Sequence, residues 1–206
     1  MSYTLRYMTL HDVPQVAAID RASFDLPWSE RSYAYEVAES SYSFMAALEA
    51  TSLRESRGWL RWLNAWNGHN RSLEQAVVGF GGLWNVGDEA HISTIAVHPD
   101  WRGRQLGEIL LAGMIRRSLE LRASFVALEV RVSNTIAQNL YRKYEFQVVG
   151  VKERYYRNND EDAYDMRLDL TDEAAIARFD ERLAALQARQ PFTDRYSTFN
   201  RPRPAA

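Results

Sequence analysis

The sequence predicts a mixed α/β fold in which helices flank one central sheet. Strand-like segments follow one another directly near both ends of the chain, and in the middle they alternate with segments of helical period. Successive strands favour antiparallel hairpins, whereas strands separated by helices favour parallel pairing, so the sheet should contain both kinds. A length of 206 residues suits one domain with appendages.

The first half of the chain should open with a strand and two short helices. Residues Tyr3–Tyr7 alternate like a strand, Thr9 can cap the helix that follows, and Ser29 can cap a second one. Turn-type residues at 85–88 predict an antiparallel hairpin between the strands on either side of them. The strands expected in this region are Ser43–Glu49, Ala76–Trp84 and Ala90–Val97.

The period changes after Pro99. Apolar residues then recur at helical spacing and predict a helix over about Leu106–Arg122, and β-branched residues predict a strand at Phe125–Val132. The remaining elements expected are a helix at Asn134–Tyr144 and two closing strands, Phe146–Tyr156 and Tyr164–Leu170. Together these elements make a core domain of residues 1–170.

An insert at residues 51–75 interrupts this domain. It carries several arginines, and apolar residues at helical spacing: Trp59, Trp62, Leu63 and Trp66. This pattern predicts a short amphipathic helix folded onto the domain. A mobile lid, a helix that docks a partner and attachment to a membrane surface are the alternatives.

Two further segments follow the core domain. Residues 171–190 predict a helix that Thr171 caps and Pro191 ends. Its apolar stripe consists of Ile176, Phe179, Leu183 and Leu186. Residues 191–206 contain three of the six prolines and predict a flexible tail.

Composition excludes several classes of site. The chain has no cysteine, so disulfides, thiolate metal sites and cysteine nucleophiles are excluded. A net charge of −2 argues against a polyanion binder that acts through bulk electrostatics. No apolar run approaches the roughly 20 residues of a membrane span, and the N-terminus lacks a basic start followed by an apolar core, so we expect a cytoplasmic protein without a membrane partner.

The histidines indicate no metal site. The four in the chain are His11, His69, His91 and His98. They show no paired ligand spacing, so no metal is expected and each histidine should be structural or exposed.

The loop before the long helix is the first candidate site. Residues 93–111 have the pattern of a strand, a turn and a loop that opens a helix, and Gly103 and Gly107 allow close backbone approach. Backbone N–H groups beside the positive end of a helix dipole form a site suited to phosphate. The spacing matches neither a Walker loop nor the dinucleotide fingerprint, and a purely structural turn is an equal alternative.

Glu129 and Tyr141 form the second candidate site. A carboxylate within an apolar strand is costly to bury unpaired, so Glu129 should face solvent, pair with Arg131, or serve as a general base in a cleft with a raised pKa. Tyr141 is either a core aromatic or a phenol that protonates a leaving thiolate.

These motifs, in this order, resemble the GNAT family of N-acetyltransferases over about residues 3–170. The matching motifs are Pro27-Trp28-Ser29, Ile95-Ala96-Val97-His98-Pro99, the loop Arg102 to Gly107, Glu129-Val130-Arg131, Ser133-Asn134, Ala137 and Leu140-Tyr141. The resemblance implies a sheet whose central strands splay apart, acetyl-CoA as co-substrate and no metal. Within the family it is greatest to the bacterial branch that acetylates the N-terminal alanine of a ribosomal protein.

The resemblance also implies a role for each candidate residue. Glu129 would take a proton from the acceptor amine through water, and Tyr141 would protonate the CoA thiolate. Trp28 and either Tyr156 or its neighbour Tyr155 would flank the acceptor. Residues expected to bind acetyl-CoA are Ile95, Ala96, Val97, Arg102, Gly103, Arg104, Gln105, Leu106, Gly107, Glu108 and Asn134. Since no cysteine can form an acyl-enzyme, direct attack in a ternary complex is expected.

The acceptor implied is a protein N-terminal α-amine, specifically the N-terminal Ala of a small-subunit ribosomal protein. The alternatives are a broad-range N-terminal, small-amine or lysine acetyltransferase, and a non-catalytic acetyl-CoA-binding module. The insert at residues 51–75 could dock the ribosome. Two departures from the family pattern stand out, because Gln105 and Glu145 each occupy a position where Gly is expected.

Overall fold

An eight-stranded sheet forms the centre of the computed structural model, which describes residues 1–53 and 73–198. Its strands lie in the order β6-β7-β5-β4-β3-β2-β1-β8. The β4–β5 and β1–β8 pairs are parallel and the others antiparallel, so the predicted mixed sheet is confirmed. The strands are β1 (Ser2–Tyr7), β2 (Ser43–Leu53), β3 (Leu73–Val86), β4 (Glu89–Val97), β5 (Phe125–Arg131), β6 (Gln147–Tyr156), β7 (Glu161–Asp169) and β8 (Phe192–Asp194).

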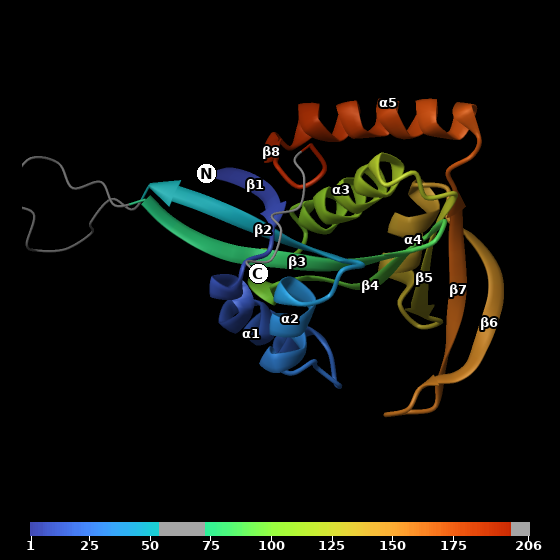
Figure 1. Cartoon of the computed structure of the whole chain (residues 1–206), viewed down its shortest axis with the longest axis horizontal. Helices are drawn as coiled ribbons and strands as arrows, with labels where there is room; N and C mark the ends of the chain where they lie inside the picture. Colours follow the sequence, from blue (N-terminus) through green and yellow to red (C-terminus); the bar gives the residue numbers. More distant parts are fainter. Residues whose placement is uncertain (54–72, 199–206) are drawn as a thin grey trace, which may run out of the picture.

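Helices cover both faces of this sheet. Figure 1 shows α1 (Val13–Ser23) and α2 (Glu30–Ala38) on one face and α3 (Leu106–Glu120) and α5 (Glu173–Arg189) on the other. The helix α4 (Thr135–Lys143) shares the apolar core of the α3 face. Short 3₁₀ turns, η1 (Leu10–Asp12) and η4 (Pro99–Trp101), precede α1 and the α3 loop. None of the helices in the described residues is long and apolar enough to cross a membrane.

The side-chain cap that the sequence predicts for α2 is present. The hydroxyl of Ser29 accepts the Ser32 N–H before α2. The helix α5 differs from the prediction, because its cap is Asp172, whose carboxylate accepts the Ala174 N–H. Thr171 instead donates its hydroxyl to Asp169. The predicted apolar stripe of this helix is confirmed at Phe179 and Leu186, which are buried.

The central strands β4 and β5 pair over only three residues each. Glu89–His91 pairs with Phe125–Ala127, and beyond these residues no pairing joins the two strands. The expected splay is therefore present. A register shift against β3 leaves Ser93 of β4 as an extra residue, which is a β-bulge. Before the bulge Ile92 faces the α3 core, and after it Ala96 faces the α1/α2 core, so the bulge inverts the faces of the strand.

The insert is shorter than the sequence predicts. Strands β2 and β3 stay paired from Thr51↔Gln75 to Leu53↔Leu73, so both ends of the predicted 51–75 insert belong to the sheet. The two strands form the long ribbon on the left of Figure 1. The expected helix around Trp62 lies outside the described residues.

The described part of the C-terminal segment is not a flexible tail. Residues 192–194 form β8 beside β1, and Arg195 N–H donates to the Leu5 carbonyl (2.7 Å). Tyr196 is fully buried, donates its hydroxyl to the Phe44 carbonyl (2.7 Å) and packs against Tyr7. The prediction of a flexible tail was wrong here because the buried ring of Tyr196 fastens the segment to the sheet despite its prolines. Residues 199–206 lie outside the described residues.

The contacts of Glu145 explain why this position departs from the family pattern. It ends the α4 turn with φ of 67°, the left-handed conformation that favours Gly. Its carboxylate accepts from Arg178 (2.8 Å) and Arg182 (2.6 Å) of α5. A glycine could not make these two contacts, which fasten α5 to the end of α4.

We expect Tyr196→Ala to lower the free energy of unfolding by about 3 kcal/mol, because it removes a buried aromatic ring. Tyr196→Phe should cost about 1 kcal/mol, the worth of one hydrogen bond. Urea denaturation measures both changes. The matched control, Arg195→Ala, alters an exposed side chain and should stay within about 0.5 kcal/mol of the wild type. Equal stability of Tyr196→Ala and the wild type would contradict the docking of this segment.

Candidate functional site

The open side of β4 offers backbone N–H groups. The His98 N–H donates to the Val78 carbonyl of β3 (2.9 Å). Successive N–H groups of a strand alternate in direction, so Ala96 also faces β3 whereas Ile95 and Val97 face the gap between β4 and β5. Of the three β4 residues expected to bind acetyl-CoA, two therefore present free N–H groups to a ligand in the gap. Ala96 contributes packing on the α1/α2 face.

The loop before α3 supplies a second set of N–H groups. The first regular hydrogen bond of α3 runs from Ile109 N–H to the Gln105 carbonyl (3.2 Å), so the N–H groups of Leu106 and Gly107 precede it and have no acceptor within the helix. Gly103 has φ of 76°, and a Cβ there would meet nothing within 4 Å, so the backbone at Gly103 is open. These features fit the predicted diphosphate cradle.

Arginine side chains hold this loop in shape. Arg102 donates from Nε to the Val97 carbonyl (3.1 Å) and from Nη2 to the Ser23 hydroxyl (3.1 Å), which ties the loop to β4 and α1. The Arg104 guanidinium lies over the Trp101 ring at 4.9 Å. Gln105 takes φ of 61°, the left-handed conformation that favours Gly. Its backbone is therefore strained at the position where the family pattern has Gly. Farther along, Asn134 caps α4 by accepting the Ala137 N–H (3.1 Å).

Glu108 differs from the other predicted acetyl-CoA contacts. Its N–H donates to the Gln105 carbonyl (3.1 Å), so it is not free for phosphate. Its buried carboxylate accepts from Tyr144 (3.0 Å) and pairs with Lys143 and, at 3.5 Å, with Arg189 of α5. The geometry makes Glu108 a link between α3, α4 and α5.

Glu129 lies on the α1/α2 face of β5, because Leu128 and Val130 on either side of it face the α3 core. Its Oε2 is 3.0 Å from His91 Nε2 of β4, and its Oε1 pairs with the Lys152 ammonium of β6. The predicted partner Arg131 does not contact it. Glu129 is thus a partly covered carboxylate held by the Lys152 ammonium and by the His91 imidazole, which is cationic only when protonated.

The pKa of Glu129 is shifted in the direction opposite to the one expected. Burial disfavours its ionised form, but hydrogen bonds from His91 and Lys152, with their positive charges, outweigh burial and lower the pKa of Glu129 to about 2. The predicted raised pKa is therefore wrong. In return, the hydrogen bond to Glu129 raises the pKa of His91 above its usual value.

Tyr141 lies on the other face of the sheet. It belongs to the α3-side core, and only 5% of it is exposed. Burial raises the pKa of Tyr141, so its phenol stays protonated at neutral pH. Glu129 and Tyr141 come from opposite faces, so a molecule that reaches both must pass through the gap between β4 and β5.

Aromatic rings line the α1/α2 face beside Glu129. Trp28 stacks on Trp84 with centroids 6.2 Å apart, and Trp84 lies 5.9 Å from the His91 ring. The Trp28 N–H donates to the buried Asp20 (2.6 Å), which fixes the loop between α1 and α2. Trp28, which was predicted to flank the acceptor, is therefore linked to Glu129 through a series of ring contacts by way of Trp84 and His91.

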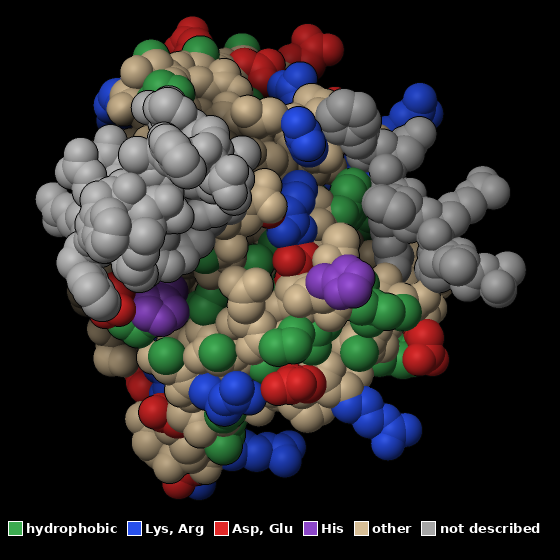
Figure 2. Space-filling model, turned by 90° about the vertical axis from the view of Figure 1, so that its left-hand side faces the viewer, with side chains coloured by type: hydrophobic (Ala, Val, Ile, Leu, Met, Phe, Trp, Pro, Cys, Tyr) green, Lys and Arg blue, Asp and Glu red, His purple; other side chains and the backbone are tan. Residues whose placement is uncertain are grey.

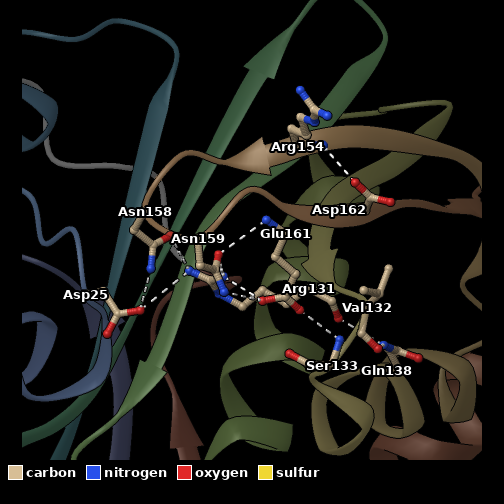
Figure 3. Close-up of polar contacts among 10 residues, drawn as sticks. All are labelled: Asp25, Arg131, Val132, Ser133, Gln138, Arg154, Asn158, Asn159, Glu161 and Asp162. Carbon is tan, nitrogen blue, oxygen red and sulfur yellow. Dashed lines mark hydrogen bonds and ion pairs between the residues drawn. The ribbon is translucent and has the colours of Figure 1, made fainter.

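Arg131 joins the β6–β7 turn to the α1–α2 loop. It donates to Glu161 (2.7 Å) and Asn158 (3.0 Å), and its Nη2 is 3.7 Å from the Asp25 carboxylate (Figure 3). Its guanidinium also lies 3.8 Å from the centroid of Tyr156, the second predicted acceptor residue. Two loops from distant parts of the chain are thereby held together beside the site.

Sequence reasoning missed two side chains of this cluster, and it left the choice between Tyr155 and Tyr156 open. His91 was expected to be structural or exposed, Lys152 was not considered, and Tyr155 lies nearer to Glu129 than Tyr156 does, since a hydrogen bond to Glu129 contributes to its raised pKa after burial. The alternation of Ala90, His91 and Ile92 was the available signal for His91. Nothing in the sequence indicated Lys152, because its contact with Glu129 depends on the register in which β6 pairs with β7 and β7 with β5.

Charge is not segregated on the surface in view. Figure 2 shows basic and acidic side chains interspersed over the described part of that face. In residues 1–53 and 73–198, no group of three or more His, Asp or Glu side chains has the geometry of a metal site. The expectation of no metal stays a prediction.

Comparisons with known proteins agree with this geometry. Residues 14–146 match the sequence model of the Acetyltransferase (GNAT) family. The chain is 35% identical over 159 residues to a putative [ribosomal protein bS18]-alanine N-acetyltransferase of Bacillus subtilis (strain 168), which covers 77% of this chain and 90% of that protein.

Solved structures share the fold. The crystal structure of the ribosomal-protein-S18-alanine N-acetyltransferase from Escherichia coli has a TM-score of 0.64 at 26% identity, over 82% of this chain and 95% of that one. Arabidopsis thaliana NAA60 in complex with acetyl-CoA has a TM-score of 0.63 at 17% identity, over 83% of this chain and 100% of that one. Together with the family match, which spans more than half of the sequence, these likenesses identify the chain as a member of the GNAT family of acetyltransferases.

Proposed function

We propose that this protein transfers the acetyl group of acetyl-CoA to the N-terminal α-amine of a protein, with the N-terminal Ala of a small-subunit ribosomal protein as acceptor. The observation that carries the proposal is the gap between β4 and β5, with Glu129 on one face of the sheet and Tyr141 in the core on the other. The names of the Bacillus and Escherichia relatives support the acceptor.

Acetyl-CoA would lie with its diphosphate on the N–H groups of the loop before α3 and its pantetheine arm in the gap. The free N–H groups of Ile95 and Val97 would hold the arm by β-type hydrogen bonds. One of them would also polarise the thioester carbonyl and stabilise the oxyanion that forms on attack. The side chains of Arg102 and Asn134 would keep this cradle in shape.

The acceptor amine must lose a proton before it attacks. An α-ammonium has a reference pKa of about 8, so at neutral pH most of it is protonated. The ionised Glu129 would attract the ammonium to the α1/α2 side of the gap and accept its proton, directly or through water. The neutral amine then attacks the thioester carbon, and the C–S bond breaks as Tyr141 donates its proton to the thiolate. The attacking nitrogen loses its second proton as the amide forms, and this proton restores the Tyr141 phenol, so each turnover releases one proton, the one that Glu129 accepts.

The acceptor would enter between two fixed loops. Trp28 borders this entrance on the α1–α2 loop, and Tyr155 and Tyr156 border it on β6. Because Arg131 fastens these loops to each other, the two sides of the entrance are held in fixed positions. Ribosome docking through the insert would add an anchor outside the described residues.

The test is CoA release with acetyl-CoA and a panel of acceptors. The panel contains peptides beginning with Ala, Ser or Met, an N-terminally blocked peptide with an internal Lys, and a polyamine. We expect turnover confined to free Ala or Ser termini. Turnover on the blocked peptide or the polyamine would overturn the acceptor, and binding of acetyl-CoA without any turnover would favour a binding module.

Glu129→Gln should lower kcat by about a hundredfold or more, because it removes the proton acceptor, and should leave the Kd for acetyl-CoA unchanged. Tyr141→Phe should lower kcat in the same way. Steady-state kinetics and calorimetry measure the two quantities. Glu153→Gln makes the same chemical change at an exposed position of β6 and is the matched control. Full turnover by Glu129→Gln would remove Glu129 as the base.

Gln105→Gly should tighten acetyl-CoA binding or leave it unchanged, because Gln at φ of 61° costs on the order of 1 kcal/mol. Gly103→Ala is the matched opposite change. Its added Cβ meets no neighbour, so only strain acts, and we expect binding about fivefold weaker. Calorimetry measures both. Markedly weaker binding by Gln105→Gly would show that the Gln105 side chain itself contacts acetyl-CoA.

A further inference from the structure

A carboxylate–imidazole–carboxylate chain leads from the site to the surface. Glu129 Oε2 lies 3.0 Å from His91 Nε2, and His91 Nδ1 lies 3.4 Å from Glu89 Oε1. The exposed fraction of the side chain increases along this series, from 9% for Glu129 to 24% for His91 and 40% for Glu89. One end of the chain is thus at the proposed base and the other is in solvent.

A structural ion pair does not account for this arrangement. Lys152 already supplies Glu129 with a cationic partner from β6. The imidazole adds a second link whose far nitrogen faces another carboxylate, and the Trp84 ring, 5.9 Å away, packs against the imidazole. His91 is also placed before the β4 bulge, where alternation still directs it to the same face as Glu129.

We propose that His91 is a proton relay, which takes the acceptor's proton from Glu129 and passes it to solvent beside Glu89. The proposal rests on the proposed acetyl transfer. It answers a need of that reaction, because a carboxylate that the Lys152 ammonium holds ionised cannot retain a proton and must pass it on.

The proton balance is simple. The ammonium of the acceptor gives one proton to a Glu129 oxygen, and the neutral His91 takes that proton at Nε2. The imidazolium then releases a proton from Nδ1 to Glu89 or to water. Glu129 is then ionised again. The imidazole, which started with its proton on Nδ1, now carries it on Nε2, and it returns to its starting tautomer by proton exchange with solvent before the next turnover. The acetyl transfer to the amine is unaffected. No further reactant is needed.

His91 must be neutral to accept a proton, so its neighbours set the pH range of turnover. Glu89 on its own strand and Glu129 on β5 face it and favour the imidazolium. Beyond Glu129 are Lys152 and Tyr155 of β6 and Asp165 of β7, and beyond Trp84 is Glu36 of α2. Since these hydrogen bonds raise the pKa of His91, turnover should increase with pH through that raised pKa.

His91→Ala tests the relay in the full-length protein. We expect kcat to fall by about tenfold to a hundredfold, with KM for acetyl-CoA unchanged, and the limb of the pH profile that belongs to His91 to disappear. Added imidazole should restore kcat in proportion to its concentration, which a structural role would not allow. Glu89→Gln should move the limb to lower pH, because it removes one carboxylate that favours the imidazolium.

His11→Ala is the matched control, since His11 is exposed on η1, and thermal unfolding checks that each variant folds. If the wild type is active, the relay alone would be overturned by either of two results for His91→Ala: an unchanged limb of the pH profile, or a loss of kcat that imidazole does not restore. A wild type inactive on every acceptor would overturn both the proposed function and the relay.

Discussion

The separation of β4 from β5 after three paired residues is the constraint on which the rest of the site depends. It leaves the N–H groups of Ile95 and Val97 without a strand partner, and it opens a passage between the two faces of the sheet. The bulge at Ser93 then sets which side chains line each face. Since the sheet keeps its β3–β4 pairing throughout, the passage opens without loss of the core on either face.

The same geometry distributes the chemistry between the faces. The α3 face holds the helix start with its free N–H groups and the buried phenol of Tyr141, whereas the α1/α2 face holds the ionised cluster around Glu129. An anionic, flexible co-substrate and a cationic acceptor would thus approach from opposite sides and meet at the gap. Arg131 stabilises the acceptor side by tying the β6–β7 turn to the α1–α2 loop.

Local signals in the sequence predicted most elements of the fold and the positions of Glu129, Tyr141 and the α3 loop. They failed where long-range pairing decides the outcome. The ionised state of Glu129 depends on Lys152, which only the β6–β7–β5 register brings alongside it. Tyr196 is buried because it contacts Tyr7 of β1 and Phe44 of β2, which are far from it in the sequence. Glu145 keeps its left-handed backbone because two arginines of α5 hold its carboxylate.

Amide hydrogen exchange followed by NMR, with and without acetyl-CoA, tests most directly whether the gap receives the co-substrate. We expect the amides of Ile95 and Val97 and of the loop at 103–107 to exchange much more slowly when acetyl-CoA is bound. The Ala96 amide, which already faces β3, should change little. Slower exchange elsewhere in the sheet, with Ile95 and Val97 unchanged, would contradict the assignment of the gap as the acetyl-CoA site.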